Sequence, residues 1–237
     1  MKKLFLFFAG IFSVSSYVSA QDGCMPLFPT TQGTVMVTSN YDMNNNLLST
    51  MTYRVNDAYD YSSGSSTQMG FTYMDNTGQV RGTGNIDASC NDGYFSLRMD
   101  VSDTTPFMMN ALAQNTELIG NFLDYPSSFD SMDPFSTSPF TMDGGEYTVK
   151  SKSDDVSDIR VKVYNRRYET SEIVNTPAGS FNASKISFDY DVTRDGTTMR
   201  YKGVEWISPN AGIIKTETYD SNGNRINHSE LTTFREA

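Results

Sequence analysis

Apolar and polar residues alternate with a period of two through most of this 237-residue chain. The segment Ile159–Tyr164, for example, reads Ile-Arg-Val-Lys-Val-Tyr. Because the side chains of a β-strand point alternately to its two faces, this pattern predicts strands of a half-buried antiparallel sheet. The pattern recurs, with small variations, in Thr34–Thr38, Leu47–Val55, Ser66–Met74, Ala183–Val192 and Thr198–Trp206.

Short runs rich in Asn, Asp and Gly lie between these segments. Such residues readily adopt the positive φ that tight turns require. Three of the runs have strand-forming residues on both sides: Tyr41–Leu47, Tyr73–Val80 and Tyr219–Ile226. A fourth, Asp195-Gly196, lies between two further predicted strands. The sequence therefore predicts four hairpins, and their uneven spacing indicates a meander rather than a propeller or a solenoid.

One segment departs from the alternation. Thr105-Pro106 suits the N-cap and first position of a helix, and apolar residues follow at helical spacing. We therefore expect one principal helix, Pro106–Leu123, inserted among the strands. The residues after it, Tyr125–Gly145, are rich in Ser, Pro, Asp, Met and Phe, and a stretch of this kind is either a lid or a passive surface loop. The expected fold class is mainly β, with this helix and a lid-like loop at about residues 105–145.

The N-terminus is typical of a secretory signal peptide. Lys2 and Lys3 precede the apolar run Leu4–Val14, and Val18-Ser19-Ala20 supplies the small residues of a cleavage site after Ala20. The apolar run is shorter than the ~20 residues that span a bilayer. We expect residues 1–20 to be removed and residues 21–237 to form a single exported domain without a transmembrane segment, in the periplasm or at the cell surface.

The mature chain is acidic. Removal of the two N-terminal lysines leaves 16 basic and 28 acidic residues, a net charge of −12. Such a charge repels phosphate backbones and therefore disfavours nucleic-acid binding. Cys24 and Cys90 are the only two cysteines, and in an exported chain they predict a disulfide. The alternative is that Cys24 is a lipid-modified first residue.

The sequence offers little that would support catalysis or metal binding. Its single histidine, His228, follows a predicted hairpin turn, and zinc sites need clusters of His and Cys. Asp189 and Asp191 could act as an acid–base pair, but they share one strand face opposite Phe188 and Tyr190, which predicts a solvated face. We therefore expect a non-catalytic protein with no metal ion and no cofactor.

Two C-terminal motifs carry a family resemblance. One is Val174–Ile186, which contains Thr-Pro-Ala-Gly-Ser-Phe, and the other is Trp206–Glu217, which contains Trp-Ile-Ser-Pro-Asn-Ala-Gly. With the opening run Cys24–Pro29, these motifs resemble the TapB-like group of exported bacterial proteins of unknown function. The resemblance covers roughly half of the chain. It implies a single curved antiparallel sheet or half-barrel of hairpins, related to the LolA/LolB-like lipoprotein carriers.

Two functions fit these features. A curled sheet has a concave apolar face, where soft apolar side chains could hold a hydrophobic or lipid-like ligand. The alternative is a structural or protein-interaction module of the cell envelope that binds no small molecule, in which the same side chains are simply core. The candidate ligand-binding residues lie in the predicted helix and loop: Met108, Met109, Leu112, Phe122, Phe135 and Phe140, with Phe129 and Met142 beside them.

Overall fold

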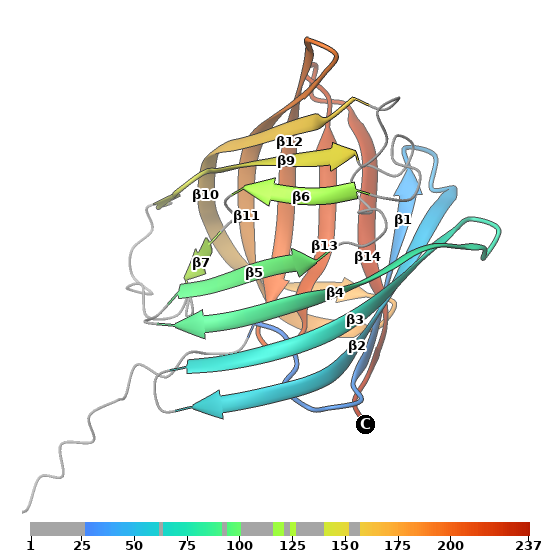
Figure 1. Cartoon of the computed structure of the whole chain (residues 1–237), viewed down its shortest axis with the longest axis vertical. Coiled ribbons are helices and arrows are strands. Elements are labelled where there is room, and N and C mark those ends of the chain that lie inside the picture. Colours follow the sequence, from blue (N-terminus) through green and yellow to red (C-terminus); the bar gives the residue numbers. More distant parts are fainter. Residues whose placement is uncertain are drawn as a thin grey trace, which may run out of the picture.

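A computed structural model describes residues 27–61, 64–91, 94–100, 116–120, 124–126, 140–151 and 157–237. These residues form one antiparallel sheet of 14 strands (Figure 1). They contain no helix, and so none that is long and apolar enough to cross a membrane. In chain order the strands are β1 (Val35–Asp42), β2 (Leu47–Tyr61), β3 (Gly64–Asp75), β4 (Val80–Asn91), β5 (Tyr94–Asp100), β6 (Thr116–Gly120), β7 (Asp124–Pro126), β8 (Thr141–Met142), β9 (Gly145–Ser151), β10 (Ile159–Thr176), β11 (Gly179–Arg194), β12 (Thr197–Ser208), β13 (Gly212–Tyr219) and β14 (Arg225–Arg235).

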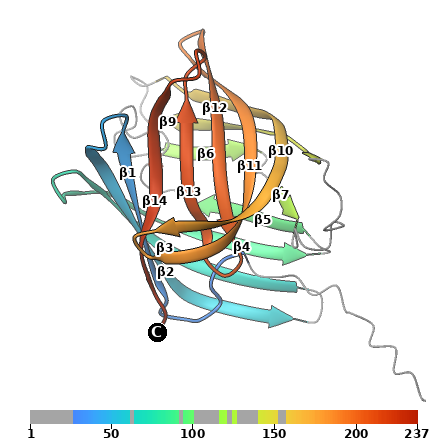
Figure 2. The same ribbon diagram turned by 180° about the vertical axis from the view of Figure 1, so that it is seen from behind.

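The order of the strands shows how the two halves of the chain are joined. Hydrogen-bonded neighbours follow the order β6-β9-β10-β11-β12-β13-β14-β1-β2-β3-β4-β5-β7, and β8 pairs with β10. The pairing of β1 with β14 connects the N-terminal hairpins to the C-terminal ones. Figure 2 shows β11 to β14 side by side on one wall, while β2 to β5 run across the other. A single, strongly curved sheet therefore contains both halves, as the family resemblance implies.

Three hairpin turns share one local geometry, and all three are predicted correctly. In each turn, Oδ1 of an Asp accepts hydrogen bonds of 2.8–3.0 Å from the backbone N–H groups two and four residues later. These residues are Asp42, Asp75 and Asp220. The third residue after each has positive φ, namely Asn45 (63°), Gly78 (81°) and Gly223 (82°). The fourth predicted turn, between β11 and β12, also has positive φ at Asp195 and Gly196.

The predicted helix is wrong over the part of it that the structure describes. Thr116–Gly120 forms strand β6, which pairs with β9 and places Leu118 opposite Val149. A short apolar run such as this one suits a strand or a helix equally well, and pairing with a neighbouring strand decides between them. The remainder of the predicted helix, residues 106–115 and 121–123, lies outside the described residues.

Other predictions fall partly or wholly outside the described residues. The predicted loop Tyr125–Gly145 contributes residues to β7, β8 and β9, and its central part, residues 127–139, is not described. The predicted signal peptide and Cys24 also lie outside the described residues. Cys90 is fully buried in β4, and its disulfide with Cys24 stays a prediction.

Candidate functional site

The register of the strands defines an inner face of the sheet. Partner residues of an antiparallel pair lie on the same face, and that face can be followed from strand to strand. One chain of partners runs from Ile186 through Glu205 and Thr216 to Ser229, and across β14 and β1 it continues to Met51 and Tyr73. Tyr125 of β7 belongs to the same face through its pairing with Phe95, which pairs with Cys90.

Contact between two distant strands across this face shows that it is the concave one. The hydroxyl of Tyr125 donates a hydrogen bond of 3.3 Å to Oε2 of Glu205. Their strands, β7 and β12, are far apart in the strand order. The two side chains can therefore meet only because the sheet curls until its inner face faces itself. The opposite face is called the outer face below.

The inner face is lined mostly by apolar side chains that belong to the main hydrophobic cluster. Several of them are methionines, whose flexible thioethers fit irregular shapes. All of the following are almost fully buried: Met36, Met51, Met69, Phe71, Tyr73, Ile86, Ile186, Ile214 and Leu231.

Three ionisable side chains are buried among these apolar groups. Tyr125 is 4% exposed, Arg166 is 1% exposed and Glu205 is 5% exposed. The guanidinium carbon of Arg166 lies 4.7 Å from the centroid of the Tyr125 ring, and its Nη1 donates a hydrogen bond of 2.9 Å to the carbonyl oxygen of Asp143. We call Tyr125, Arg166 and Glu205 the inner cluster.

A β-bulge turns Arg166 toward the inner face. Tyr164 pairs with Asp189 on the outer face, so strict alternation would place Arg166 outside as well. The register with β11 shifts between Tyr164 and Arg167, and Asn165 adopts a φ of 53°. One extra residue at this point reverses the alternation, as bulges commonly do next to functional sites.

Burial dominates the electrostatics of the inner cluster. Burial raises the pKa of Glu205 to about 7, against the opposing effects of the Arg166 charge and the Tyr125 hydrogen bond. Burial, together with the nearby Glu205 charge, raises the pKa of Tyr125 well above its ordinary value. Oε1 of Glu205 is buried and, within the described part of the chain, has no hydrogen-bond donor. A buried ionisable group with a shifted pKa and an unpaired oxygen, inside an otherwise apolar face, marks a candidate binding site.

Two residues predicted from the sequence to bind ligand, Phe140 and Met142, can be placed in the structure. The ring of Phe140 stacks on Tyr168 with 5.0 Å between ring centroids, and its carbonyl oxygen accepts a 3.0 Å hydrogen bond from the Tyr168 N–H. Met142 packs against the main hydrophobic cluster and pairs with Arg166 in the short β8–β10 ladder. The other candidates, Met108, Met109, Leu112, Phe122, Phe129 and Phe135, lie outside the described residues.

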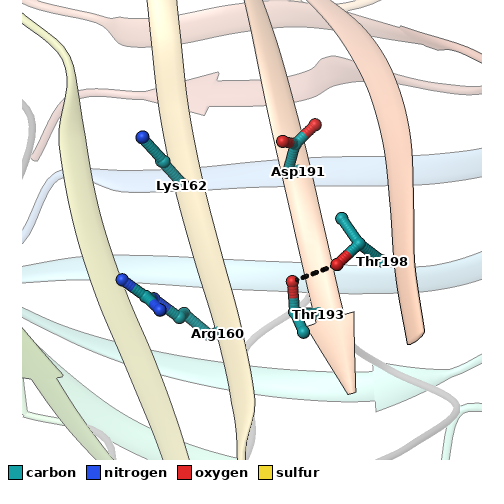
Figure 3. A pocket seen from close by; sticks show the side chains of 5 residues that line it. All are labelled: Arg160, Lys162, Asp191, Thr193 and Thr198. Atoms are coloured by element: carbon teal, nitrogen blue, oxygen red, sulfur yellow. Dashed lines mark hydrogen bonds between the residues drawn. The ribbon is translucent and has the colours of Figure 1, made fainter. Parts of the chain in front are cut away.

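The outer face carries a shallow hollow of about 210 Å³ near the ends of β10, β11 and β12. Figure 3 shows Arg160 and Lys162 on one strand, with Asp191 and Thr193 on the next. A hydrogen bond joins the hydroxyls of Thr193 and Thr198. Arg160 pairs with Glu146, and Asp191 pairs with Arg200 and accepts a hydrogen bond from Tyr164. Because most of these charges have partners at the surface, the hollow is a weaker candidate than the inner cluster.

His228 also lies on the outer face, away from the inner cluster. It pairs with Glu217 and Tyr41 in the register, and its ring stacks on Tyr41 at a centroid distance of 5.1 Å. Burial lowers its pKa below the ordinary value. Within the described segments, no group of His, Cys, Asp and Glu side chains is arranged to hold a metal ion.

Comparisons with known proteins place the chain among bacterial envelope proteins. No curated protein matches the sequence. A protein of Bacteroides fragilis, classed as exported and as having a YmcC-like fold, has a solved structure with a TM-score of 0.79 and 28% sequence identity, over 90% of this chain and 100% of its own. A protein of Parabacteroides distasonis, classed as a lipoprotein, gives a TM-score of 0.79 and 27% identity, over 90% of this chain and 99% of its own.

These similarities confirm the prediction of an exported protein of the cell envelope. The finer resemblance to the TapB-like group and to the LolA/LolB-like carriers stays a prediction. The family is shown by a match between this chain and the model of a protein family, which spans residues 31–231 and so almost all of the sheet. The chain belongs to the DUF3108-like family.

Proposed function

We propose that this protein is a non-catalytic binding protein of the bacterial envelope that holds a hydrophobic or lipid-like molecule against the inner face of its sheet. The observation that carries the proposal is the inner cluster of Tyr125, Arg166 and Glu205 within an otherwise apolar concave surface. Concave, mostly apolar surfaces with a few convergent polar groups are the usual form of small-molecule sites.

The energetics of the inner cluster argue against a purely structural role. Burying two opposite charges costs several kcal/mol of desolvation for each ion, and well-packed apolar residues in their place are often as stable or more stable. Glu205 also leaves Oε1 without a donor among the described residues, which adds about 1–3 kcal/mol of penalty. A group retained at such a cost is better explained by recognition than by stability.

A non-catalytic role is supported by the separation of the reactive side chains. His228, the only histidine, lies on the outer face, whereas Glu205 lies on the inner face. The sheet itself therefore stands between the general base that enzymes most often use and the buried carboxylate.

The test uses an apolar fluorescent probe, N-phenylnaphthylamine, and follows its uptake together with the melting temperature. Replacing Met108 or Phe122, two sequence-predicted ligand contacts, by Asp should abolish uptake while the sheet stays folded. The matched control is Ile173→Asp, because Ile173 is 74% exposed on β10 and its replacement should change neither quantity. Absence of uptake by the parent protein would reject the proposal, and so would a large fall in melting temperature for Met108→Asp and Phe122→Asp.

The alternative, a protein-interaction module, is favoured by one feature of β10. Residues Glu169–Ile173 are exposed and pair only with β11, so their other edge is left open by the strands that the structure describes. Open edges can add a strand from a partner. If the parent protein takes up no probe, and Ile173→Asp abolishes its co-elution with envelope proteins of its host, this alternative replaces the first.

A further inference from the structure

The most informative unexplained atom in the molecule is Oε1 of Glu205. Glu205 is 5% exposed, and its other oxygen, Oε2, receives the Tyr125 hydroxyl at 3.3 Å. Oε1 is fully buried without a donor in the described part of the chain. An ionised carboxylate can accept about four hydrogen bonds. The free acceptor thus lies on the concave face, where the proposed function places the ligand.

The side chains beside Glu205 on the neighbouring strands do not supply the missing donor. On β11 its register partner is Ile186, which is apolar and fully buried. On β13 its partner is Thr216, whose hydroxyl lies 2.7 Å from the Ser229 hydroxyl. The strand pairing therefore leaves one side of the carboxylate for a group that comes from outside the sheet.

The charge of Arg166 limits what that group can be. Arg166 stabilises an ionised Glu205 through space, so above about pH 7, where Glu205 is mostly ionised, the two charges nearly cancel. A ligand ammonium group would add a second buried cation beside Arg166, and a ligand carboxylate would place a second anion against Glu205. Both are expensive in a low-dielectric interior. A neutral hydroxyl brings a donor without a charge.

We infer that Glu205 recognises the polar end of the ligand, and that this ligand is a neutral lipid-like molecule with a free hydroxyl group, which donates its proton to Oε1. The inference rests on the proposed function, because it assumes that the apolar part of the same molecule lies along the methionine-rich inner face. Tyr125 holds the carboxylate from the other side through Oε2.

The test is displacement of N-phenylnaphthylamine by four compounds with the same alkyl chain: dodecanol, dodecyl methyl ether, dodecylamine and dodecanoate. At about pH 8, where Glu205 is mostly ionised, dodecanol should displace the probe at roughly 10-fold lower concentration than the ether, which lacks a donor. Dodecylamine and dodecanoate should also be weaker than dodecanol. This measurement needs only the parent protein.

Two variants then locate the effect. Glu205→Gln, which keeps the shape of the side chain but removes its charge, should reduce the preference for alcohol over ether to about threefold or less. The matched control is Glu217→Gln, because Glu217 lies on the outer face of the adjacent strand and is paired with Lys215 at 2.9 Å. This control should keep the preference of the parent protein.

The outcomes separate the two proposals. The inference about Glu205 is overturned if the protein takes up the probe but dodecanol and the ether displace it equally well. It is also overturned if the amine or the carboxylate binds more tightly than dodecanol. Either result leaves the proposed function standing. A preference for alcohol that survives in Glu205→Gln also overturns the inference. If the parent protein takes up no probe at all, the proposed function and the inference fall together.

Discussion

Two carboxylates on neighbouring strands show how differently the two faces of this sheet treat charge. Glu205 on β12 and Glu217 on β13 are almost opposite each other, since Glu205 pairs with Thr216 and Glu217 pairs with Val204. Glu217 lies on the outer face, where Lys215 is 2.9 Å away and Arg225 is 3.6 Å away. Although burial acts to raise it, hydrogen bonds from Tyr219 and Lys215 hold the pKa of Glu217 below its ordinary value.

On the inner face the balance is reversed. Burial raises the pKa of Glu205 to about 7, and the Arg166 charge and the Tyr125 hydroxyl offset only part of this effect. The outer carboxylate is satisfied by its own strand and its neighbour, whereas the inner one is not. The difference supports the proposal that the inner charges serve recognition, whereas the outer charges are paired with one another at the surface.

The largest difference between the faces should appear when one cation is removed from each. Arg166→Met should lower the free energy of unfolding by about 3–5 kcal/mol at about pH 8, where Glu205 is mostly ionised, because it removes both the cation that offsets this buried charge and the hydrogen bond to the Asp143 carbonyl oxygen. Arg225→Met on the outer face should cost less than about 1 kcal/mol, since exposed ion pairs contribute little. Urea unfolding of both variants measures this contrast. Equal losses would show that the inner cluster is not the special environment described above.

A second difference should appear in the pH dependence of stability. The folded-state pKa of Glu205, about 7, is above its unfolded value of about 4.5, so the folded protein binds the extra proton between these values. Stability should therefore fall as the pH rises from about 4.5 to 7, by on the order of 3 kcal/mol from this group alone. Glu205→Gln should remove this fall, and Glu217→Gln should not.

His228 acts in the opposite direction in part of the same pH range. Its folded-state pKa is lowered, so the unfolded chain binds more protons and stability rises as the pH approaches 6.5. Both variants retain His228, and the difference between each variant and the parent protein therefore isolates the carboxylate. A parent profile that Glu205→Gln leaves unchanged would contradict the raised pKa of Glu205.

A smaller change than those of the inner cluster is expected from an anchor on the outer face. Nε1 of Trp206 donates a 2.6 Å hydrogen bond to Glu172, and the Nζ of Lys215 lies 4.5 Å from the ring centroid. Trp206→Phe removes this donor and should lower the free energy of unfolding by about 1–2 kcal/mol. Probe uptake should be unchanged, because Trp206 and Glu205 are consecutive residues that point to opposite faces. A loss of uptake in Trp206→Phe with its fold intact would break the separation of the two faces.

The hairpins could be predicted from the sequence because their turn geometry is local. Asp42, Asp75 and Asp220 each bond to backbone groups within the next four residues, so short sequence runs suffice to identify them. Strand β6 could not be predicted in this way. Its residues follow a segment with helical spacing, and only the pairing of Leu118 with Val149 makes them a strand.

The inner cluster was not predicted, for two physical reasons. Its three residues are distant in sequence, and the curvature that brings Tyr125 to Glu205 is a property of the whole sheet. The bulge at Asn165 that turns Arg166 inward is also a change of register that alternation alone does not show. One feature of the sequence could have pointed to the inner cluster. Glu205 is a charged residue within the largely apolar run Gly203–Ile207, and by alternation it shares a strand face with Ile207. Because Trp206 on the other face is buried too, this run does not reveal which face is concave.

Native mass spectrometry of the protein purified from its own host tests most directly whether the inner face is a binding surface. The parent protein should carry an adduct of lipid-like mass that organic extraction removes, and Glu205→Gln should carry much less of it than Glu217→Gln. The control is the same protein with added dodecanol, whose complex must survive the measurement. If only the mature chain without an adduct is then detected in the protein from its host, the account is contradicted, since the inner face would hold no ligand in the cell.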